Sequence, residues 1–390
     1  MNFMLIAGET SGDLLATELV CAIRSGNVGL EPRFFGAGRQ QMAAAGVELA
    51  VDMTPFGVVG FSDVLKRVLP IRRAFQRLLA LAVERQPDVI IGVDYGGFNL
   101  RFAAAIRRHA AARRGTFANW QPKLVQFVSP QVWASRAGRA KQMERDLDLL
   151  LSIFPFEKDW YAQRVPKLRV QFVGHPIFDR YPTAHSGSAS SPIPHPPSSP
   201  ALLLLPGSRA GEVRRHLPVM LGALALLRRK LPALRAEIIL PNESLLAQAR
   251  TLGLLADVAA SLGGLAEALT RATVALASTG TVTVECAFFG VPTVTLYKTS
   301  WSTYEIGRRL VKVKSLTMPN LLAGEEVFPE FIQDLATAEN LAGAALPLLT
   351  DATRRAAVTA KLGQLVASLG APGAARRAAQ AIAELPPSQP

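Results

Sequence analysis

Leu202-Leu203-Leu204-Leu205-Pro206-Gly207-Ser208-Arg209-Ala210-Gly211-Glu212 is the stretch that decides the fold of this 390-residue chain. Its apolar run predicts a buried strand, Pro206 and Gly207 predict a tight turn, and the segment after Arg209 has helical character. Such a helix start gathers unpaired N–H groups and the positive end of the helix dipole, which favours an anion. Arg209 adds a permanent charge that can grip two phosphate oxygens. A phosphate site that includes Ser208 and an ordinary turn with an exposed arginine fit this stretch equally well.

Similar apolar runs recur along the chain, with helical segments between them. In the first half they are residues 3–7, 33–36, 89–93, 124–128, 149–154 and 170–173, and in the second half 201–205, 236–240, 274–277 and 293–297. Near-continuous runs of Val, Ile and Leu are typical of parallel strands that are covered on both faces. We therefore predict an α/β protein with two doubly wound, Rossmann-like sheets in succession.

A Pro- and Ser-rich segment at 183–200 separates the two halves. It cannot bury apolar area, and its prolines keep it extended or irregular. We predict an N-terminal domain at 1–182, a linker or exposed loop at 183–200 and a C-terminal domain at 201–385. The last helix of that second domain is free to pack back on the first domain, and residues 386–390 are expected to be a disordered tail.

The composition narrows the class of protein. A hydrophobic content of 49% supports two packed cores, and the two cysteines and five histidines show no spacing typical of a metal site. We expect Cys21 and Cys286 to be small apolar fillers of packed helices. Because no apolar run is long enough to cross a bilayer, and the run at 3–8 predicts a first strand, we expect a cytoplasmic protein.

The net charge of +13 indicates either an anionic partner or a compositional bias of the sequence. Lys and Arg outnumber Asp and Glu strongly between residues 66 and 114. Few aromatic residues lie among these charges and no nucleic-acid motif accompanies them, so an anionic membrane surface is favoured over nucleic acid. A high arginine content that reflects base composition is the alternative.

The loop after the first strand reads Glu9-Thr10-Ser11-Gly12-Asp13. It matches neither the dinucleotide fingerprint nor the Walker pattern. It does place hydroxyls and carboxylates at the carboxyl edge of a sheet, where open α/β proteins bind ligands. The alternative is that Ser11 or Asp13 only caps the following helix.

Asp94 directly follows the predicted strand at 89–93 and precedes two glycines. A rigid strand would fix its carboxylate while the loop lets a substrate approach, which suits a general base. Capping of the helix that begins near Asn99 is the alternative. After the strand at 124–128, Ser129 either caps the next helix or faces a ligand, and Trp133 either contacts a ligand or packs in the core.

Residues 57–86 predict a basic amphipathic helix. Val64, Val68, Ile71, Phe75, Leu78 and Ala82 recur at helical spacing, while Lys66, Arg73 and Arg77 share another face. Such a helix fits an interfacial membrane contact, although a core-facing helix with a solvated basic side fits equally well. Phe56 and Phe61 stand beside valines and glycines and could admit an apolar ligand.

In the second half, Thr279-Gly280-Thr281 ends a strand and precedes a helix start, which predicts a second anion site. Glu285, on the first turns of that helix, either accepts hydrogen bonds from a ribose diol or complements the helix dipole. Asn320 and Gln333 offer polar groups in an apolar setting, as the reading of a uracil edge requires.

In this order and spacing, the motifs resemble the lipid-A-disaccharide synthases, glycosyltransferases of GT-B architecture. The resemblance covers nearly the whole chain. Its marks are Gly8-Glu9-Thr10-Ser11-Gly12-Asp13, Val93-Asp94, Phe98-Asn99, Ser129-Pro130, Trp133-Ala134, Pro155-Phe156-Glu157, Val173-Gly174-His175, Leu205-Pro206-Gly207-Ser208-Arg209, Gly280-Thr281, Glu285, Leu316 and Pro319-Asn320-Leu321-Leu322. The chain departs from the family pattern at Tyr95-Gly96-Gly97, at Ser135 and at Thr279, which keeps a hydroxyl.

The resemblance implies an inverting enzyme that joins UDP-2,3-diacylglucosamine to 2,3-diacylglucosamine 1-phosphate, giving a β(1′→6) disaccharide and UDP. It also implies two domains that face each other across a cleft, and attachment to the anionic cytoplasmic face of the inner membrane. No cofactor or metal is implied, and a homodimer is left open. Asp94 would be the base. The other implied contacts are, for the donor, Gly207, Ser208, Arg209, Thr279, Gly280, Thr281, Glu285, Asn320 and Gln333; for the acceptor or cleft, Glu9, Ser11, Gly12, Asp13, Phe56, Phe61, Asn99, Ser129 and Trp133; and for the membrane, Lys66, Arg67, Arg72, Arg73 and Arg77.

Two rival functions stay open from the sequence. Another GT-B enzyme, such as a UDP-sugar epimerase or a transferase for a different lipid-linked acceptor, would turn over UDP-N-acetylglucosamine without an acylated substrate. A basic protein that binds nucleic acid or membrane through a degenerate site would bind its partner regardless of Asp94 and Arg209.

Overall fold

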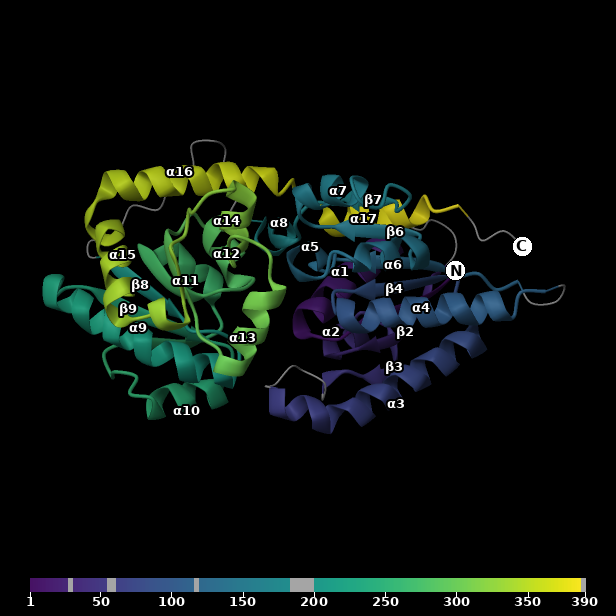
Figure 1. The fold of residues 1–390 in the computed structure, drawn as a ribbon, viewed down its shortest axis with the longest axis horizontal. Coiled ribbons are helices and arrows are strands. Elements are labelled where there is room, and N and C mark those ends of the chain that lie inside the picture. Colours follow the sequence, from purple (N-terminus) through teal and green to yellow (C-terminus); the bar gives the residue numbers. More distant parts are fainter. Residues whose placement is uncertain (27–30, 55–60, 116–118, 183–199, 387–390) are drawn as a thin grey trace. The chain divides into compact units, whose positions relative to one another are not determined.

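The computed structural model describes residues 1–26, 31–54, 61–115, 119–182 and 200–386, with the backbone alone at 61–67, 302 and 306 (Figure 1). The chain forms two compact units, one of Met1–Arg180 with Leu369–Pro390 and one of Tyr181–Ser368. Phe56 and nearly all of the predicted segments 183–200 and 386–390 lie outside the described residues, as do the side chains of Phe61, Lys66 and Arg67.

The first unit is built on a seven-stranded parallel sheet of order β3-β2-β1-β4-β5-β6-β7. Its strands are β1 (Asn2–Ala7), β2 (Arg33–Gly38), β3 (Glu48–Asp52), β4 (Val89–Val93), β5 (Lys123–Phe127), β6 (Leu149–Ser152) and β7 (Val170–Phe172). Its helices are α1 (Thr10–Gly26), α2 (Gln40–Ala44), α3 (Phe61–Arg85), α4 (Gly96–Ala112), α5 (Val132–Ser135), α6 (Arg139–Asp146), α7 (Pro155–Ala162), α8 (Ile177–Arg180) and α17 (Ala374–Ala383).

The second unit is built on a six-stranded parallel sheet of order β10-β9-β8-β11-β12-β13. Its strands are β8 (Ala201–Leu205), β9 (Arg235–Leu240), β10 (Ala259–Leu262), β11 (Val274–Ser278), β12 (Thr293–Tyr297) and β13 (Glu330–Ile332). Its helices are α9 (Ala210–Lys230), α10 (Glu243–Thr251), α11 (Leu265–Arg271), α12 (Val282–Phe288), α13 (Trp301–Leu310), α14 (Met318–Ala323), the short 3₁₀ helix Gln333–Leu335, α15 (Ala338–Thr350) and α16 (Ala352–Ser368).

The prediction of two doubly wound parallel sheets is confirmed, and every predicted strand is present. Each unit has an apolar core between its sheet and the covering helices, in which strand residues such as Ile90 and Leu204 meet helix residues such as Phe102 and Leu224. The leucines of β8 from Leu202 on are all buried, as expected for a strand covered on both faces.

Three strands were not predicted from the sequence: β3, β10 and β13, each at an edge of its sheet. An edge strand is covered less completely, so its sequence carries more polar residues and lacks the apolar run of a central strand. In β10, three of the four residues are exposed. The central strands were therefore predictable from composition, whereas these edges were not.

The C-terminal segment returns to the first unit, where α17 packs on α1 (yellow and purple in Figure 1). Asp179 accepts hydrogen bonds from the N–H groups of Gly373 and Ala374 at the start of α17. The N–H of His175 donates to the carbonyl of Leu369 at 2.9 Å. Residues from Leu369 on therefore belong to the first unit, so the last helix of the predicted segment 201–385 lies on the first unit, as the sequence analysis left open.

Helix α3 has the predicted amphipathic character. Leu78 and Ala82 are fully buried in the first unit's core, whereas the side chains of Arg72, Arg73 and Arg77 are exposed. The core-facing interpretation is therefore confirmed for the second half of the helix.

Two further findings concern the cysteines and membrane spans. Among the described residues both cysteines are free, but only Cys286 is buried; Cys21 is exposed, so its predicted role as a core filler was wrong. Within the described part of the chain, no helix is both long and apolar enough to cross a membrane.

Candidate functional site

Asp94 stands at the carboxyl end of β4 in a left-handed conformation, with φ of +51°. Helix α4 begins after Tyr95, which is its N-cap residue. The carboxylate of Asp94 instead accepts a hydrogen bond from the hydroxyl of Ser11 at 3.3 Å. The helix-capping alternative for Asp94 is therefore wrong, and its carboxylate lies beside the start of α1.

Burial raises the pKa of the Asp94 carboxyl above its ordinary value, and hydrogen bonds from Ser11 and from the backbone of Tyr95 partly oppose this rise. A carboxylate with a raised pKa is a stronger base, provided that it is still ionised at the working pH. The start of α1 lies next to the base, since a Cβ on Gly12 would be in ordinary van der Waals contact with the Cβ of Asp94, at 3.5 Å.

The rest of the predicted loop at 9–13 divides between two roles. Asp13 is only 1% exposed, and its carboxylate accepts hydrogen bonds from the N–H groups of Arg39 and Gln41 at 2.7 and 3.0 Å. It therefore fixes the turn between β2 and α2, and its place in an acceptor cleft stays a prediction. Ser11 is exposed and Glu9 is half-buried at the same edge of the sheet.

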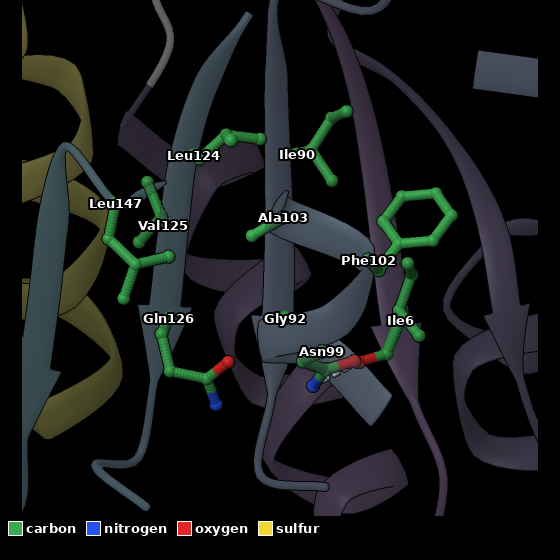
Figure 2. A pocket seen from close by; sticks show the side chains of 10 residues that line it. All are labelled: Ile6, Ile90, Gly92, Asn99, Phe102, Ala103, Leu124, Val125, Gln126 and Leu147. Carbon is green, nitrogen blue, oxygen red and sulfur yellow. Dashed lines mark hydrogen bonds between the residues drawn. The ribbon is translucent and has the colours of Figure 1, made fainter. Parts of the chain in front are cut away.

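Two buried amides, Asn99 and Gln126, line a small pocket (Figure 2) and bond to the backbone of Asp94. Asn99 on α4 and Gln126 on β5 each donate a hydrogen bond to the carbonyl oxygen of Asp94, at 3.0 and 2.9 Å. Asn99 is 4% exposed, and its predicted place on the acceptor side of the site stays a prediction. Gln126 was not predicted, although a glutamine inside an otherwise apolar strand was a signal that could have found it.

Beside these amides lies a buried polar cluster that contains the predicted residues Ser129 and Trp133. The hydroxyls of Ser129 and Tyr161 lie 2.9 Å apart, and the indole N–H of Trp133 donates to Glu157 at 3.0 Å. Burial raises the pKa of Glu157 to about 7, against the opposing hydrogen bond from Trp133. The N-cap of α5 is Gln131, so Ser129 serves this cluster and not a helix cap.

In the second unit, the turn from β8 into α9 carries the predicted phosphate loop. Gly207 has φ of +120°, a conformation that favours glycine, and a Cβ there would lie 2.4 Å from Oε2 of Glu212. That same oxygen accepts a hydrogen bond from the N–H of Ser208 at 3.0 Å, and Oε1 is 3.0 Å from the guanidinium of Arg209. Glu212 therefore holds the turn in shape, a role that the sequence analysis did not assign.

A buried histidine joins this turn to the end of β12. His216 is 0% exposed; its Nδ1 lies 2.8 Å from the carbonyl oxygen of Pro206, and its Nε2 lies 3.0 Å from the N–H of Lys298. These contacts fit a neutral imidazole with its proton on Nδ1. Burial lowers the pKa of His216, which favours this neutral form. A single histidine in an amphipathic helix gave no signal from which this role could be predicted.

The predicted donor residues Gln333 and Asn320 are both engaged within the protein. Oε1 of Gln333 accepts a hydrogen bond from the N–H of Thr299 at 2.7 Å. Asn320 is 2% exposed; its amide donates to the carbonyl of Phe328 and to Glu330, and its oxygen accepts twice from the backbone of the same turn. Because these four bonds use its full hydrogen-bonding capacity, Asn320 shapes the turn before β13, and its contact with the nucleoside stays a prediction.

The strand end at Thr279-Gly280-Thr281 is open at its tip. Gly280 and Thr281 are exposed, and Gly280 has φ of +146°. Glu285, on α12, is half-buried and accepts a hydrogen bond from the hydroxyl of Tyr181 at 3.0 Å. This segment and the Gly207–Arg209 turn both follow the carboxyl ends of neighbouring strands, β11 and β8, so they lie at one edge of the second sheet.

The comparisons with known proteins agree on one family. The family model described as lipid-A-disaccharide synthetase matches residues 3–385. A lipid-A-disaccharide synthase of Geobacter sulfurreducens is 37% identical over 98% of this chain and 97% of its own length. That of Myxococcus xanthus is 34% identical over 99% of this chain and 98% of its own length.

Among solved structures, a UDP-GlcNAc 2-epimerase from Neisseria meningitidis bound to UDP-GlcNAc aligns with a TM-score of 0.66 and 10% identity over 98% of this chain and 100% of its own. A calicheamicin glycosyltransferase aligns with a TM-score of 0.59 and 16% identity over 99% of both chains. At these identities, the likeness shows the fold alone, which is that of GT-B enzymes.

Proposed function

This chain belongs to the lipid-A-disaccharide synthase family, and we propose how its residues carry out the transfer. The family match over residues 3–385 is the observation that carries the function. The protein is a hexosyltransferase that joins UDP-2,3-diacylglucosamine to 2,3-diacylglucosamine 1-phosphate and releases UDP. The α-linked donor gives a β-linked product, so a single displacement with inversion suffices and no nucleophile of the enzyme is needed.

In this proposal Asp94 is the general base. As the 6-hydroxyl of the acceptor attacks the anomeric carbon of the donor, its proton passes to the carboxylate of Asp94. Two observations support this role: the carboxylate stands at the carboxyl end of a central strand, and burial raises its pKa. Ser11, which donates to this carboxylate, orients it and limits the rise in pKa.

The second unit would hold the donor. Arg209 and the N–H groups at the start of α9 would meet the diphosphate, whose negative charge grows as UDP departs. Because Glu212 and His216 fix this turn from below, the donors stand ready before substrate arrives. Glu285 and the exposed Thr279–Thr281 turn at the same sheet edge would meet the ribose and the neighbouring phosphate. UDP or UDP-GlcNAc is bound in several of the GT-B neighbours, which supports a UDP-sugar as the ligand.

The acyl chains of both substrates and the surface of α3 point to the membrane as the place of reaction. Near the start of the described part of α3, Val68 and Leu69 are 51% and 63% exposed, and Arg72, Arg73 and Arg77 lie exposed further along. Apolar side chains beside arginines suit the boundary of an anionic bilayer. We therefore propose peripheral attachment through α3 to the cytoplasmic face of the inner membrane, where the acceptor phosphate would also be found.

The reaction is tested by incubating the protein with both acylated glucosamines and measuring the mass of the product. The wild-type protein should yield the disaccharide 1-phosphate, and Asp94→Asn should lower kcat by ~10²–10⁴ while UDP affinity, measured by calorimetry, stays the same. Turnover of UDP-N-acetylglucosamine without any acylated substrate would favour an epimerase. Full activity of Asp94→Asn would show that another group is the base.

A further inference from the structure

Gln126 is the most deeply placed polar side chain beneath the base. It is the last residue but one of β5, between Val125 and Phe127, and is 1% exposed. A buried side-chain amide costs free energy unless its hydrogen bonds are satisfied, so its presence in an apolar strand needs a reason. Its Nε2 lies within hydrogen-bonding distance of three carbonyl oxygens: that of Asp94 at 2.9 Å, that of Val128 at 3.1 Å and that of Phe127 at 3.3 Å.

Two of these carbonyls belong to residues in strained backbone conformations. Asp94 has φ of +51° and Val128 has φ of +67°. The left-handed region is disfavoured for L-residues, and a β-branched residue is rare there. Asp94 and Val128 directly follow the neighbouring strands β4 and β5. One amide group thus bonds to both strained strand ends at once.

The pocket is shaped to admit this amide, as Figure 2 shows. Gly92 lies between the two amides on β4, where a Cβ would stand 2.7 Å from Oε1 of Gln126 and 2.8 Å from the Cβ of Asn99. Asn99 reaches the same carbonyl of Asp94 from α4 at 3.0 Å. The carbonyl of Asp94 is therefore held from β5 and from α4 together.

We propose that Gln126 is a positioning residue for the base: by holding the carbonyls of Asp94 and Val128, it keeps Asp94 left-handed and its carboxylate aimed toward Ser11. This inference rests on the proposed role of Asp94. Without the amide, the strained backbone relaxes towards an extended conformation, which turns the carboxylate away from its place. A displacement of a catalytic group by about 1 Å can lower the rate 10²-fold. Because the displaced group is the carboxylate that accepts the proton, the expected loss is in kcat.

The test is Gln126→Met, which keeps the length of the side chain and removes its N–H donors. We expect kcat to fall by about 10- to 100-fold, with UDP affinity and the KM for the donor within twofold of wild type. Ser152→Ala is the matched control, because Ser152 is equally buried on the adjacent strand β6 and its hydroxyl finds no partner among the described residues. Its kcat should equal that of the wild type.

A double-mutant cycle with Asp94→Asn shows where Gln126 acts. If it acts through the base, Asp94→Asn with Gln126→Met should be no slower than Asp94→Asn alone. The inference is overturned if Gln126→Met lowers kcat as much in the Asp94→Asn background as in the wild type. It is also overturned if Gln126→Met alone keeps the wild-type kcat, or if its donor KM rises as its kcat falls. Thermal unfolding shows whether Gln126→Met is folded. If it is not, Asn99→Leu is used instead, because it removes the second donor to the carbonyl of Asp94; its kcat must fall while the donor KM stays unchanged. Full activity of Asp94→Asn would instead refute the assignment of the base.

Discussion

The turn at Gly207 offers a sharp test of the proposed donor site. Its φ of +120° is in a region that L side chains rarely adopt, and a Cβ there would lie 2.4 Å from Oε2 and 2.7 Å from the Cβ of Glu212. The contact with Cβ cannot be relieved by rotating the end of the glutamate side chain alone. In Gly207→Ala the turn must therefore move, and with it the N–H of Ser208 and the guanidinium of Arg209 that Glu212 holds.

The expected magnitude follows from the backbone strain. Holding a non-glycine residue in such a conformation costs about 1–3 kcal/mol. In the free variant the turn shifts and the strain is relieved. Because the UDP complex needs the turn in its original place, the strain lowers the free energy gained on UDP binding. Because each 1.4 kcal/mol is tenfold in affinity, we expect UDP to bind roughly 5- to 150-fold more weakly.

Isothermal titration calorimetry with UDP measures this effect directly. Gly343→Ala is the matched control, since Gly343 lies in α15 of the same unit and its added Cβ would meet no described atom within 4 Å apart from its chain neighbours and the backbone of its own helix. The control should bind UDP as the wild type does and be slightly more stable, because alanine favours a helix. Wild-type affinity in Gly207→Ala would refute the role of this turn.

Three further outcomes are expected. Burial raises the pKa of Glu157 to about 7, so between pH 4.5 and 7 the folded protein holds a proton that the unfolded chain has lost. The free energy of unfolding should therefore fall by up to about 3 kcal/mol as the pH rises from 4.5 through 7. Urea unfolding of Glu157→Gln should lack this pH dependence. His216→Leu leaves two buried backbone groups unpaired and should lower both Tm and the calorimetric affinity for UDP. Charge reversal of Arg72, Arg73 and Arg77 should abolish most sedimentation with anionic vesicles.

Each of these outcomes has a specific contradiction. An unchanged pH slope in Glu157→Gln would show that other groups set it, and unchanged UDP affinity in His216→Leu would limit that histidine to stability. For the vesicles, charge reversal of the exposed Arg108, Arg113 and Arg114, on α4 and just beyond it, changes the net charge equally and is the control for net charge alone. Vesicle binding that falls equally in both variants would refute a specific surface on α3.

Sequence and structure contributed differently to the site. Asp94 and the Gly207–Arg209 turn were predictable because each directly follows a strongly apolar strand, and the carboxyl ends of parallel strands carry the ligand loops. Asp13, Asn99 and Asn320 were assigned to ligands on the same reasoning, and the structure shows all three hydrogen-bonded within the protein. Whether a polar side chain faces a ligand or a neighbouring backbone group depends on partners far along the chain, which no local pattern specifies.

The sequence by itself determined the two parallel sheets, their central strands and the family, because buried parallel strands require apolar runs and the loops after them require particular residues. The tertiary structure alone decided the edge strands β3, β10 and β13 and the roles of Gln126 and His216. These three edge strands lack the apolar signal because they are only partly covered. The role of a buried amide or imidazole depends on its hydrogen-bond partners, and only the folded chain brings those carbonyls and N–H groups to within about 3 Å of it.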